Sequence, residues 1–458
     1  MSDIVTIPQH TEPVPVDLNA QILDRIAKRR FTVSVIGLGY VGLPLALIAC
    51  RAGFDVLGYD IDAQRVALLN RGETGILHLA GATLQEAVAS GRFTATTDEK
   101  ALAKADAILI AVPTPLTRQR APDLSFIEQT AETIARSLRR GQLVVLESTT
   151  WPGTTIEIVK PILEKSGLKS GIDFFLAFSP EREDPGNTAF ETSVVPKVVG
   201  GDGPVALEVA KALYDCLFAK TVPVSTPATA EAVKLTENIF RAVNIALVNE
   251  LKLIYSKMGI DIWEVIDAAK TKPFGFMPFY PGPGLGGHCI PIDPFYLTWK
   301  AREFDISTRF IELAGEINTL MPYHVVDRLA EALDMQAGRG LNGSRILMIG
   351  IAYKKNVDDM RESPGLRLIE LMESRGASVD YFDPFVPVIG KTREHARLEG
   401  RRSIQFTPEA LTRYDAAVIA TDHDKIDVGT LVEQSKLVVD TRNMCARRGI
   451  VATKIVKA

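Results

Sequence analysis

Cysteine is scarce in this sequence, with four residues in 458, and the spacing excludes two classes of protein. Cys50, Cys216, Cys289 and Cys445 lie far apart, with no CxxC pair and no metal-ligand spacing, so neither a disulfide framework nor a metal site is expected. Reduced thiols of this kind are typical of the cytoplasm, which is the predicted location. Cys50 and Cys216 fall in apolar helical stretches and are expected to be small buried hydrophobes.

An excess of positive charge is also missing. The net charge is −4 and the pI is near 6.0, and Lys and Arg form no basic stripe. Because nucleic-acid binding needs a basic surface facing the phosphates, no nucleic-acid partner is expected.

The chain has little that resembles a targeting or membrane segment. Residues 31–50 carry no charge, but Gly37, Gly39, Gly42 and Pro44 interrupt them, so no membrane span is predicted. The N-terminus lacks the basic start and apolar core of a signal peptide, and the first half of the extension at 1–30 is expected to be a flexible tail.

Strands and helices alternate through most of the remaining sequence. Residues 31–60 predict a strand, a glycine turn, a helix and a second strand, and further strands follow in "ADAILIAVPTP", "GQLVVLESTT", "DFFLAFSPE" and "PKVVGG". The pattern becomes purely helical near 216 and returns in weaker form after 342. We therefore predict an α/β protein with two Rossmann-like, doubly wound domains at 31–215 and 331–458, joined by a helical domain at 216–330.

The glycine turn carries the first functional motif. Gly37, Gly39 and Gly42 form GxGxxG between a strand and a helix, and Asp60 closes the next strand, where a carboxylate can bind ribose hydroxyls. This context predicts that the turn binds NAD. Arg65, a few residues further on, means that NADP is not excluded. A turn that binds no ligand is the alternative. The other predicted cofactor contacts are Tyr40, Val41, Thr114 and Thr149.

A polar stripe runs along the predicted helix of the middle region. Lys234, Asn238 and Arg241 are spaced i, i+4 and i+7, so they share one face. A solvated face or a salt bridge is one interpretation. The other is that a lysine and an amide stabilise an oxyanion near a thiol.

That thiol is Cys289, in the stretch "PGPGLGGHCIPIDP". Glycines at 282, 284, 286 and 287 permit a close backbone approach to a ligand, and four prolines stiffen the loop. His288 and Asp293 are near enough in sequence to activate the thiol. A structural turn with an inert cysteine is the alternative.

A charged patch, "FSPEREDPGN", follows another predicted strand. Its members Glu181, Arg182, Glu183 and Asp184 would lie at the carboxyl edge of the sheet, where α/β proteins bind ligands. They could transfer protons or hold water, or form a solvated loop.

Six motifs together resemble the UDP-glucose/GDP-mannose dehydrogenase family of nucleotide-sugar 6-dehydrogenases. They are "VIGLGYVGLPLA", "ESTTWPGTT", "SPEREDPGN", "KLTENIFRAVNIALVNEL", "PGPGLGGHCIPIDP" and "AYKKNVDDMRESP", and the resemblance extends from about residue 31 to the C-terminus. The variants "SPEREDPGN" and "GGHC" resemble most the branch that oxidises UDP-N-acetylhexosamines, especially UDP-N-acetylglucosamine.

The resemblance implies an NAD-dependent, four-electron oxidation of a sugar C6 alcohol to a carboxylate. Cys289 matches the nucleophile that forms a thiohemiacetal and then a thioester. Lys234 and Asn238 match the pair that stabilises the oxyanions. Asp293 and Thr149 match the residues that position water and protons, and Glu181 matches a glutamate of thioester hydrolysis. Pro185 stands where the UDP-glucose branch has a second glutamate, so whether Glu183 or Asp184 replaces it is open.

The resemblance also implies a substrate site and an assembly. The expected UDP-sugar contacts are Arg182, Arg241, Gly286, Lys354, Arg361 and Arg442, and the helix at about 228–258 matches a dimer core, so a homodimer or larger oligomer is expected. UDP-ManNAc or UDP-GalNAc is the alternative substrate. A non-catalytic nucleotide-binding or redox-sensing protein is the rival of a different class.

Overall fold

The computed structural model describes residues 16–75, 81–117, 121–182, 192–287, 290–392 and 394–458. Contacts divide the chain into two units, Met1–Leu235 and Thr236–Ala458, and each unit is described by itself. The division falls within one helix, so the three-domain boundaries given above stay a prediction.

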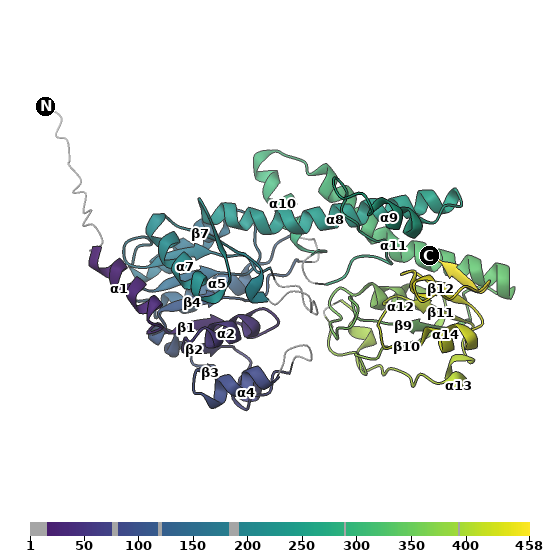
Figure 1. Cartoon of the computed structure of the whole chain (residues 1–458), viewed down its shortest axis with the longest axis horizontal. Coiled ribbons are helices and arrows are strands. Elements are labelled where there is room, and N and C mark those ends of the chain that lie inside the picture. Colours follow the sequence, from purple (N-terminus) through teal and green to yellow (C-terminus); the bar gives the residue numbers. More distant parts are fainter. Residues whose placement is uncertain (1–15, 76–80, 118–120, 183–191, 288–289, 393) are drawn as a thin grey trace. The chain divides into compact units, whose positions relative to one another are not determined.

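The first unit is built on an eight-stranded sheet (Figure 1). The strand order is β3-β2-β1-β4-β5-β6-β7-β8, and all neighbours are parallel except β6 and β7. The inner strands β1, β4, β5 and β6 are buried at every position, as expected for strands covered on both faces. Their bounds are β1 Val33–Ile36, β2 Val56–Tyr59, β3 Phe93–Thr96, β4 Ala107–Ile110, β5 Leu143–Leu146, β6 Phe175–Phe178, β7 Lys197–Gly201 and β8 Thr221–Val224.

Helices cover this sheet, and one of them belongs to the N-terminal extension. Ile22 and Ile26 of α1 are buried in the core of the first unit, so the second half of the extension is a packed helix. The predicted tail in the first half lies outside the described residues. The helices are α1 Val16–Ala27, α2 Gly42–Arg51, α3 Ala63–Asn70, α4 Gly81–Ala89, α5 Ser125–Ala135, α6 Lys160–Leu163, α7 Pro204–Leu217 and α8 Pro227–Lys257, with short turns of helix at Glu99–Lys104, Thr155–Val159, Glu164–Ser166 and Thr192–Val194.

The second unit combines long helices with a five-stranded parallel sheet of order β10-β9-β11-β12-β13. Helix α8 continues into this unit, and α11 has 29 residues. The bounds are α9 Ile262–Ala269, α10 Asp293–Ala301, α11 Arg309–Ala337, β9 Arg345–Ile349, α12 Pro364–Ser374, β10 Ser378–Phe382, α13 Pro408–Leu411, β11 Ala416–Ile419, α14 Val428–Gln434, β12 Val438–Asp440, α15 Met444–Arg447 and β13 Ile455–Lys457, with short turns at Arg302–Phe304 and Ala396–Leu398.

Both sheets reverse their strand order beside their first strand. The chain leaves β1 towards β2 and later returns to β4 on the other side, and β9, β10 and β11 repeat this arrangement. Ligands of open α/β sheets bind at such a switch point, beyond the carboxyl ends of the strands. The predicted fold class, two Rossmann-like sheets with a helical connector, is confirmed.

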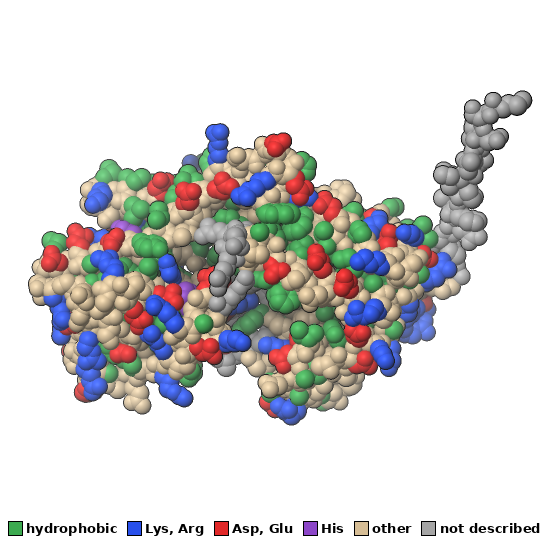
Figure 2. Space-filling model, turned by 180° about the vertical axis from the view of Figure 1, so that it is seen from behind, with side chains coloured by type: hydrophobic (Ala, Val, Ile, Leu, Met, Phe, Trp, Pro, Cys, Tyr) green, Lys and Arg blue, Asp and Glu red, His purple; other side chains and the backbone are tan. Residues whose placement is uncertain are grey.

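The surface carries charges of both signs. Figure 2 shows Lys and Arg interspersed with Asp and Glu over the face in view. Among the helices that the structure describes, none is long and apolar enough to cross a membrane.

Candidate active site

The turn after β1 places one open glycine between two enclosed ones. Gly37 has a φ of +86°, and a Cβ on it would lie 2.6 Å from the carbonyl oxygen of Ala111. A Cβ on Gly42 would lie 1.8 Å from the carbonyl oxygen of Gly37, whereas no atom lies within 4 Å of a Cβ on Gly39. Tight turning, helix packing and an open backbone are the three glycine roles of a pyrophosphate-binding turn.

An acid and an arginine flank this turn. Asp60 follows β2, and its two oxygens accept hydrogen bonds from the backbone N–H of Leu38 (2.8 Å) and of Asp62 (3.0 Å). Arg65 donates to the carbonyl oxygen of Leu38 at 3.1 Å. A carboxylate oxygen has more than one acceptor site, so Asp60 retains capacity for ribose hydroxyls. Tyr40 and Val41 lie within the same turn, immediately before α2.

Two threonines follow the strands next to the switch point. Thr114 is buried in the loop after β4, and Thr149 is half-buried in the loop after β5. Ser148 joins these loops, because its hydroxyl donates to the carbonyl oxygen of Val112 at 2.7 Å. Both predicted cofactor threonines therefore lie at the edge where the glycine turn lies.

A buried ionic cluster lies next to Glu181, and no motif in the sequence marks it. Lys197 Nζ lies 2.5 Å from Glu147 Oε2 and 3.9 Å from Glu181 Oε2, and the Tyr214 hydroxyl donates to Glu147. Burial raises the pKa of Glu147 although Lys197 opposes this. Lys234 donates to the backbone oxygen of Glu181, so a predicted oxyanion-stabilising lysine and a predicted acid are in contact.

The polar stripe of α8 is buried at Lys234 and Asn238 and half-buried at Arg241. Asn238 donates through its amide nitrogen to Asp293 and accepts through its amide oxygen from Arg241. Asn238 is 0% exposed, Lys234 5% and Asp293 1%, so the interpretation as a solvated face is wrong. Asp293 begins α10, and the contact orients its carboxylate towards α8.

The glycines at 282, 284, 286 and 287 pack against the chain itself. A Cβ on Gly282 would lie 2.6 Å from a guanidinium nitrogen of Arg442, and those on Gly286 and Gly287 would lie 2.7 and 2.9 Å from Tyr353. Arg442 donates to the carbonyl oxygen of Ala420 at 2.9 Å, and burial lowers its pKa. At Gly286 and Gly287 the close approach of Tyr353 thus already requires glycine, whereas at Gly282 the nearest atoms belong to the movable end of a side chain.

Buried amides fix the start of this loop. Asn249 of α8 accepts from the backbone N–H of Gly282 at 3.1 Å and donates to Asn318 of α11 at 2.9 Å. Asn318 in turn donates to the carbonyl oxygen of Ala242 at 3.1 Å. These residues, which no sequence pattern singled out, connect two long helices to the loop that precedes Cys289.

The loop at 350–363 carries two predicted substrate residues. Arg361 forms a two-pronged ion pair with Asp359, with distances of 2.7 to 3.0 Å, and its carbonyl oxygen accepts from the backbone N–H of Gly287 at 3.0 Å. Lys354 is half-buried in the same loop. The glycine loop and the loop of Lys354 are therefore directly linked.

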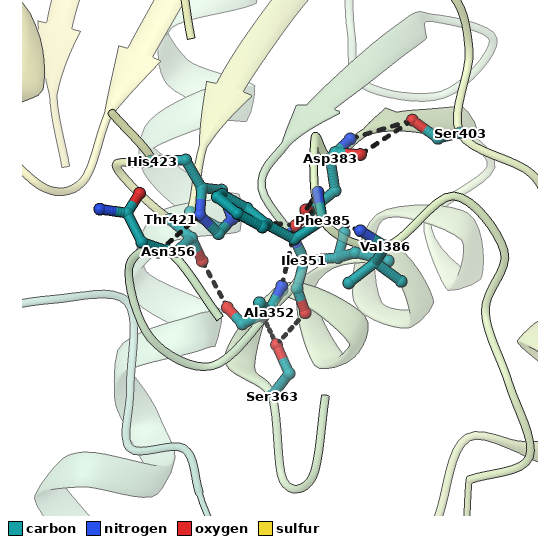
Figure 3. A network of polar contacts seen from close by, with 12 residues as sticks. Ile351, Ala352, Asn356, Ser363, Asp383, Phe385, Val386, Ser403, Thr421 and His423 are labelled. Atoms are coloured by element: carbon teal, nitrogen blue, oxygen red, sulfur yellow. Dashed lines mark hydrogen bonds and ion pairs between the residues drawn. The ribbon is translucent and has the colours of Figure 1, made fainter. Parts of the chain in front are cut away.

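Asp383 and His423 anchor the loop at 350–363 (Figure 3). Asp383 Oδ2 accepts from the backbone N–H of Ile351 (2.7 Å), from that of Ala352 (3.1 Å) and from His423 Nε2 (3.0 Å). His423 Nδ1 accepts from the backbone N–H of Asn356 at 2.9 Å, so the proton of a neutral ring is on Nε2. No sequence pattern marks the histidine as a partner of this acid.

Several predicted residues lie outside the described residues. They are Glu183, Asp184, Pro185, His288 and Cys289. Arg182 is described, and it donates to the carbonyl oxygen of Pro196 at 2.6 Å. Within the described ranges, no group of three His, Cys, Asp or Glu could hold a metal ion.

Known proteins share this architecture and are similar to this chain in sequence. Residues 31–218 match the NAD binding domain of the UDP-glucose/GDP-mannose dehydrogenase family, residues 228–320 its central domain and residues 347–447 its UDP binding domain. The NDP-N-acetyl-D-galactosaminuronic acid dehydrogenase of Ralstonia nicotianae is 37% identical over 92% of this chain and 98% of its own. The UDP-N-acetyl-D-glucosamine 6-dehydrogenase of Pseudomonas aeruginosa is 36% identical over 86% of this chain and 90% of its own.

A solved structure agrees. That of a UDP-D-ManNAc dehydrogenase from Pyrococcus horikoshii superposes with a TM-score of 0.83 at 33% identity, covering 93% of this chain and 98% of the other. The glycine turn and its sheet define an NAD-binding enzyme. The chain belongs to the UDP-glucose/GDP-mannose dehydrogenase family and is an oxidoreductase with NAD as its cofactor.

Proposed function

We propose that this enzyme oxidises the C6 alcohol of a UDP-N-acetylhexosamine, UDP-N-acetylglucosamine first among them, to the carboxylate. One sugar CH₂OH and one water give COOH, while two NAD⁺ are reduced to two NADH and two further protons are released. Relatives that act on derivatives of glucosamine, mannosamine and galactosamine match this chain almost equally, which supports the N-acetylhexosamine class.

The observation that carries the proposal is the buried contact of Asn238 with Asp293, close in sequence to Cys289. In the proposed reaction the Cys289 thiolate attacks the C6 aldehyde to give a thiohemiacetal, which is oxidised to a thioester. Asn238 and Lys234 donate hydrogen bonds to the oxyanions, and Asp293 with Thr149 holds the protons and water of the two half-reactions. Glu181 directs water at the thioester.

The described residues at the first switch point fit NAD. Gly39 leaves its backbone open, and Asp60 retains acceptor capacity for ribose hydroxyls. When bound, NAD accepts a hydride from the sugar C6. On the substrate side, we propose that Lys354, Arg361, Arg442 and Gly286 bind the UDP moiety, with Arg182 and Arg241 as further contacts.

The test is NADH formation at 340 nm with UDP-GlcNAc, UDP-ManNAc, UDP-GalNAc and UDP-glucose supplied separately. We expect two NADH per UDP-GlcNAc, and no such turnover in Cys289→Ala. The matched control is Cys216→Ala, since burial raises the pKa of the Cys216 thiol and no role is proposed for it. Preference for another N-acetylhexosamine would correct the substrate, and no turnover with any of the four would favour a nucleotide-binding protein.

We also propose a homodimer formed through α8. Phe240, Leu247 and Ile254 recur every seven residues on this helix and are 48%, 49% and 47% exposed, which gives one apolar stripe. Light scattering after size exclusion should give at least twice the chain mass, and Leu247→Glu should lower it. A wild-type protein of single-chain mass would contradict the dimer.

A further inference from the structure

A cavity in the second unit shares no residue with the proposed NAD and UDP-sugar contacts. Its volume is about 420 Å³, and it lies between the end of α8, the start of α9, helix α11 and strand β13. It is lined by Lys252, Ser256, Gly259, Ile260, Asp261, Ile262, Trp263, His324, Arg328, Ile455, Val456, Lys457 and Ala458.

Basic side chains outnumber acidic ones in the lining of this cavity. Asp261, the one acidic side chain in the lining, is paired with Lys457 at 2.5 Å, and Arg328 pairs with Glu331 beside the cavity. Lys252 has no such partner in the part of the chain that the structure describes. Among the basic side chains of the lining, Lys252 is therefore one without a carboxylate partner.

Three nitrogen donors on the cavity-lining residues are buried without an acceptor among the described residues. They are Lys252 Nζ, Trp263 Nε1 and Arg328 Nε. Lys252 is 4% exposed, and burial, reinforced by the charge of Arg442, lowers its pKa to about 7. Unpaired buried donors are rare because each costs free energy, and a buried ammonium costs most. A ligand with several acceptor oxygens could form hydrogen bonds with all three nitrogens.

We propose that this cavity binds a small molecule bearing an oxyanion, a phosphate or a carboxylate, whose oxygens accept from Lys252, Arg328 and Trp263. The lysine side chain has four rotatable bonds, so its ammonium can turn to meet an anion in the cavity. Ile260, Ile262 and Ile455 supply apolar contacts for the rest of the molecule. The site is independent of the proposed reaction.

The test is calorimetric titration of the full-length protein with inorganic phosphate, and separately with acetate, against sodium chloride at matched ionic strength. We expect one saturable site per chain for at least one of the two anions. Binding of acetate, which is ionised at both pH values, should take up close to one proton at about pH 8.5 and almost none near pH 6, because Lys252, with a pKa of about 7, becomes fully protonated beside an anion. Buffers of different ionisation enthalpy report this uptake.

Variants show which residue takes up the proton and whether the anion binds in this cavity. The charge of Lys252 is also influenced by the other charged and titratable groups around the cavity, so Lys252→Met is needed to isolate its contribution. These groups are Asp261, His324, Arg328, Lys457, Arg442 and the terminal carboxylate of Ala458. The Lys252→Met variant should bind at least about tenfold more weakly and lose the proton uptake. Arg328→Met, which removes a second donor, should also weaken binding and serves if Lys252→Met does not fold. Lys257→Met, at an exposed position of the same helix, should change neither quantity.

Three results would overturn the proposal. The first is no saturable binding of either anion to the wild type. The second is unchanged binding and proton uptake in Lys252→Met. The third is displacement of the bound anion by UDP, which would place it at the nucleotide site. A lower assembly mass in Lys252→Met, without anion binding by the wild type, would show instead that a second copy of the chain satisfies the lysine.

Discussion

After β1 the chain turns at Gly37, and after β9 it turns at Gly350 with nearly the same geometry. The φ angles are +86° and +77°, and a Cβ would lie 2.6 Å from the carbonyl oxygen of Ala111 in one sheet and 2.5 Å from that of Thr421 in the other. The two sheets thus repeat one sterically enforced turn. They differ in the length of chain that follows, since α2 begins at Gly42 and α12 only at Pro364.

The acids at the ends of β2 and β10 differ more. Asp60 is partly exposed and accepts two backbone N–H groups, whereas Asp383 is fully buried and also accepts from His423. In the first sheet the acid remains available to a ligand. In the second it fastens the longer loop that carries Lys354 and Arg361. A strand-end acid in this fold therefore takes its role from its burial and partners rather than from its position.

The largest expected effect follows from removing the buried acid. Asp383→Ala leaves the N–H groups of Ile351, Ala352 and His423 without their acceptor, and we expect it to lower the free energy of unfolding by about 3–5 kcal/mol. Asp60→Ala should lower the free energy of unfolding by clearly less. Urea unfolding of the two variants measures the contrast, and an equal or larger loss for Asp60→Ala would refute it.

The glycines test whether the turns are equivalent. Gly37→Ala and Gly350→Ala should each destabilise by about 1–3 kcal/mol, because both need a positive φ and lack room for a Cβ. Gly39→Ala meets no atom within 4 Å and should leave stability almost unchanged while raising the KM for NAD. Thermal unfolding with NAD kinetics separates these effects. A strongly destabilised Gly39→Ala would show that the open position is structural.

Asp60 should affect the cofactor more than the fold. Asp60→Asn keeps the size of the side chain but removes its charge and one acceptor, and we expect the KM for NAD to rise about tenfold. The matched change Asp383→Asn should leave that KM within about twofold, since Asp383 belongs to the other sheet. Initial rates at varied NAD test the pair, and equal KM values in both variants would be the contrary result.

The smallest expected effect is in the pH dependence of stability. Burial raises the pKa of Asp383, but hydrogen bonds from His423 and from backbone amides lower it by a larger amount. The pKa of Asp383 therefore lies below 3.8 in the folded protein. A depressed folded pKa adds stability that is complete above 3.8 and is lost as the pH falls below it. The stability difference between wild type and Asp383→Asn should therefore shrink from pH 5 to pH 3. A constant difference over that range would contradict the assignment.

Local pattern in the sequence was sufficient for the fold and for part of the site. The glycine turn, its helix and Asp60 lie within one βαβ unit, where periodicity and spacing determine the geometry. Lys234, Asn238 and Arg241 share a helix, so their common face was also predictable. The contact of Asp293 with Asn238 was not predictable, because the two residues are 55 positions apart.

Contacts between distant segments account for what the sequence did not predict. Asn249 meets Asn318 across 69 residues, and His423 meets Asp383 across 40. Lys197 and Glu147 come together only because β5 and β7 belong to one sheet. Such pairs depend on tertiary packing, and none of them has a spacing or composition that marks it in a single sequence.

The packing of the loop glycines also has a consequence for engineering. At 282, 284, 286 and 287 the space for a side chain is already occupied by Arg442, Pro322, Pro364 or Tyr353. Libraries that aim to change the preferred sugar should therefore hold positions 284, 286 and 287 constant and vary the residues that surround them. A chain that acquires a new specificity by mutation is expected to conserve the path of this backbone while its neighbours diverge.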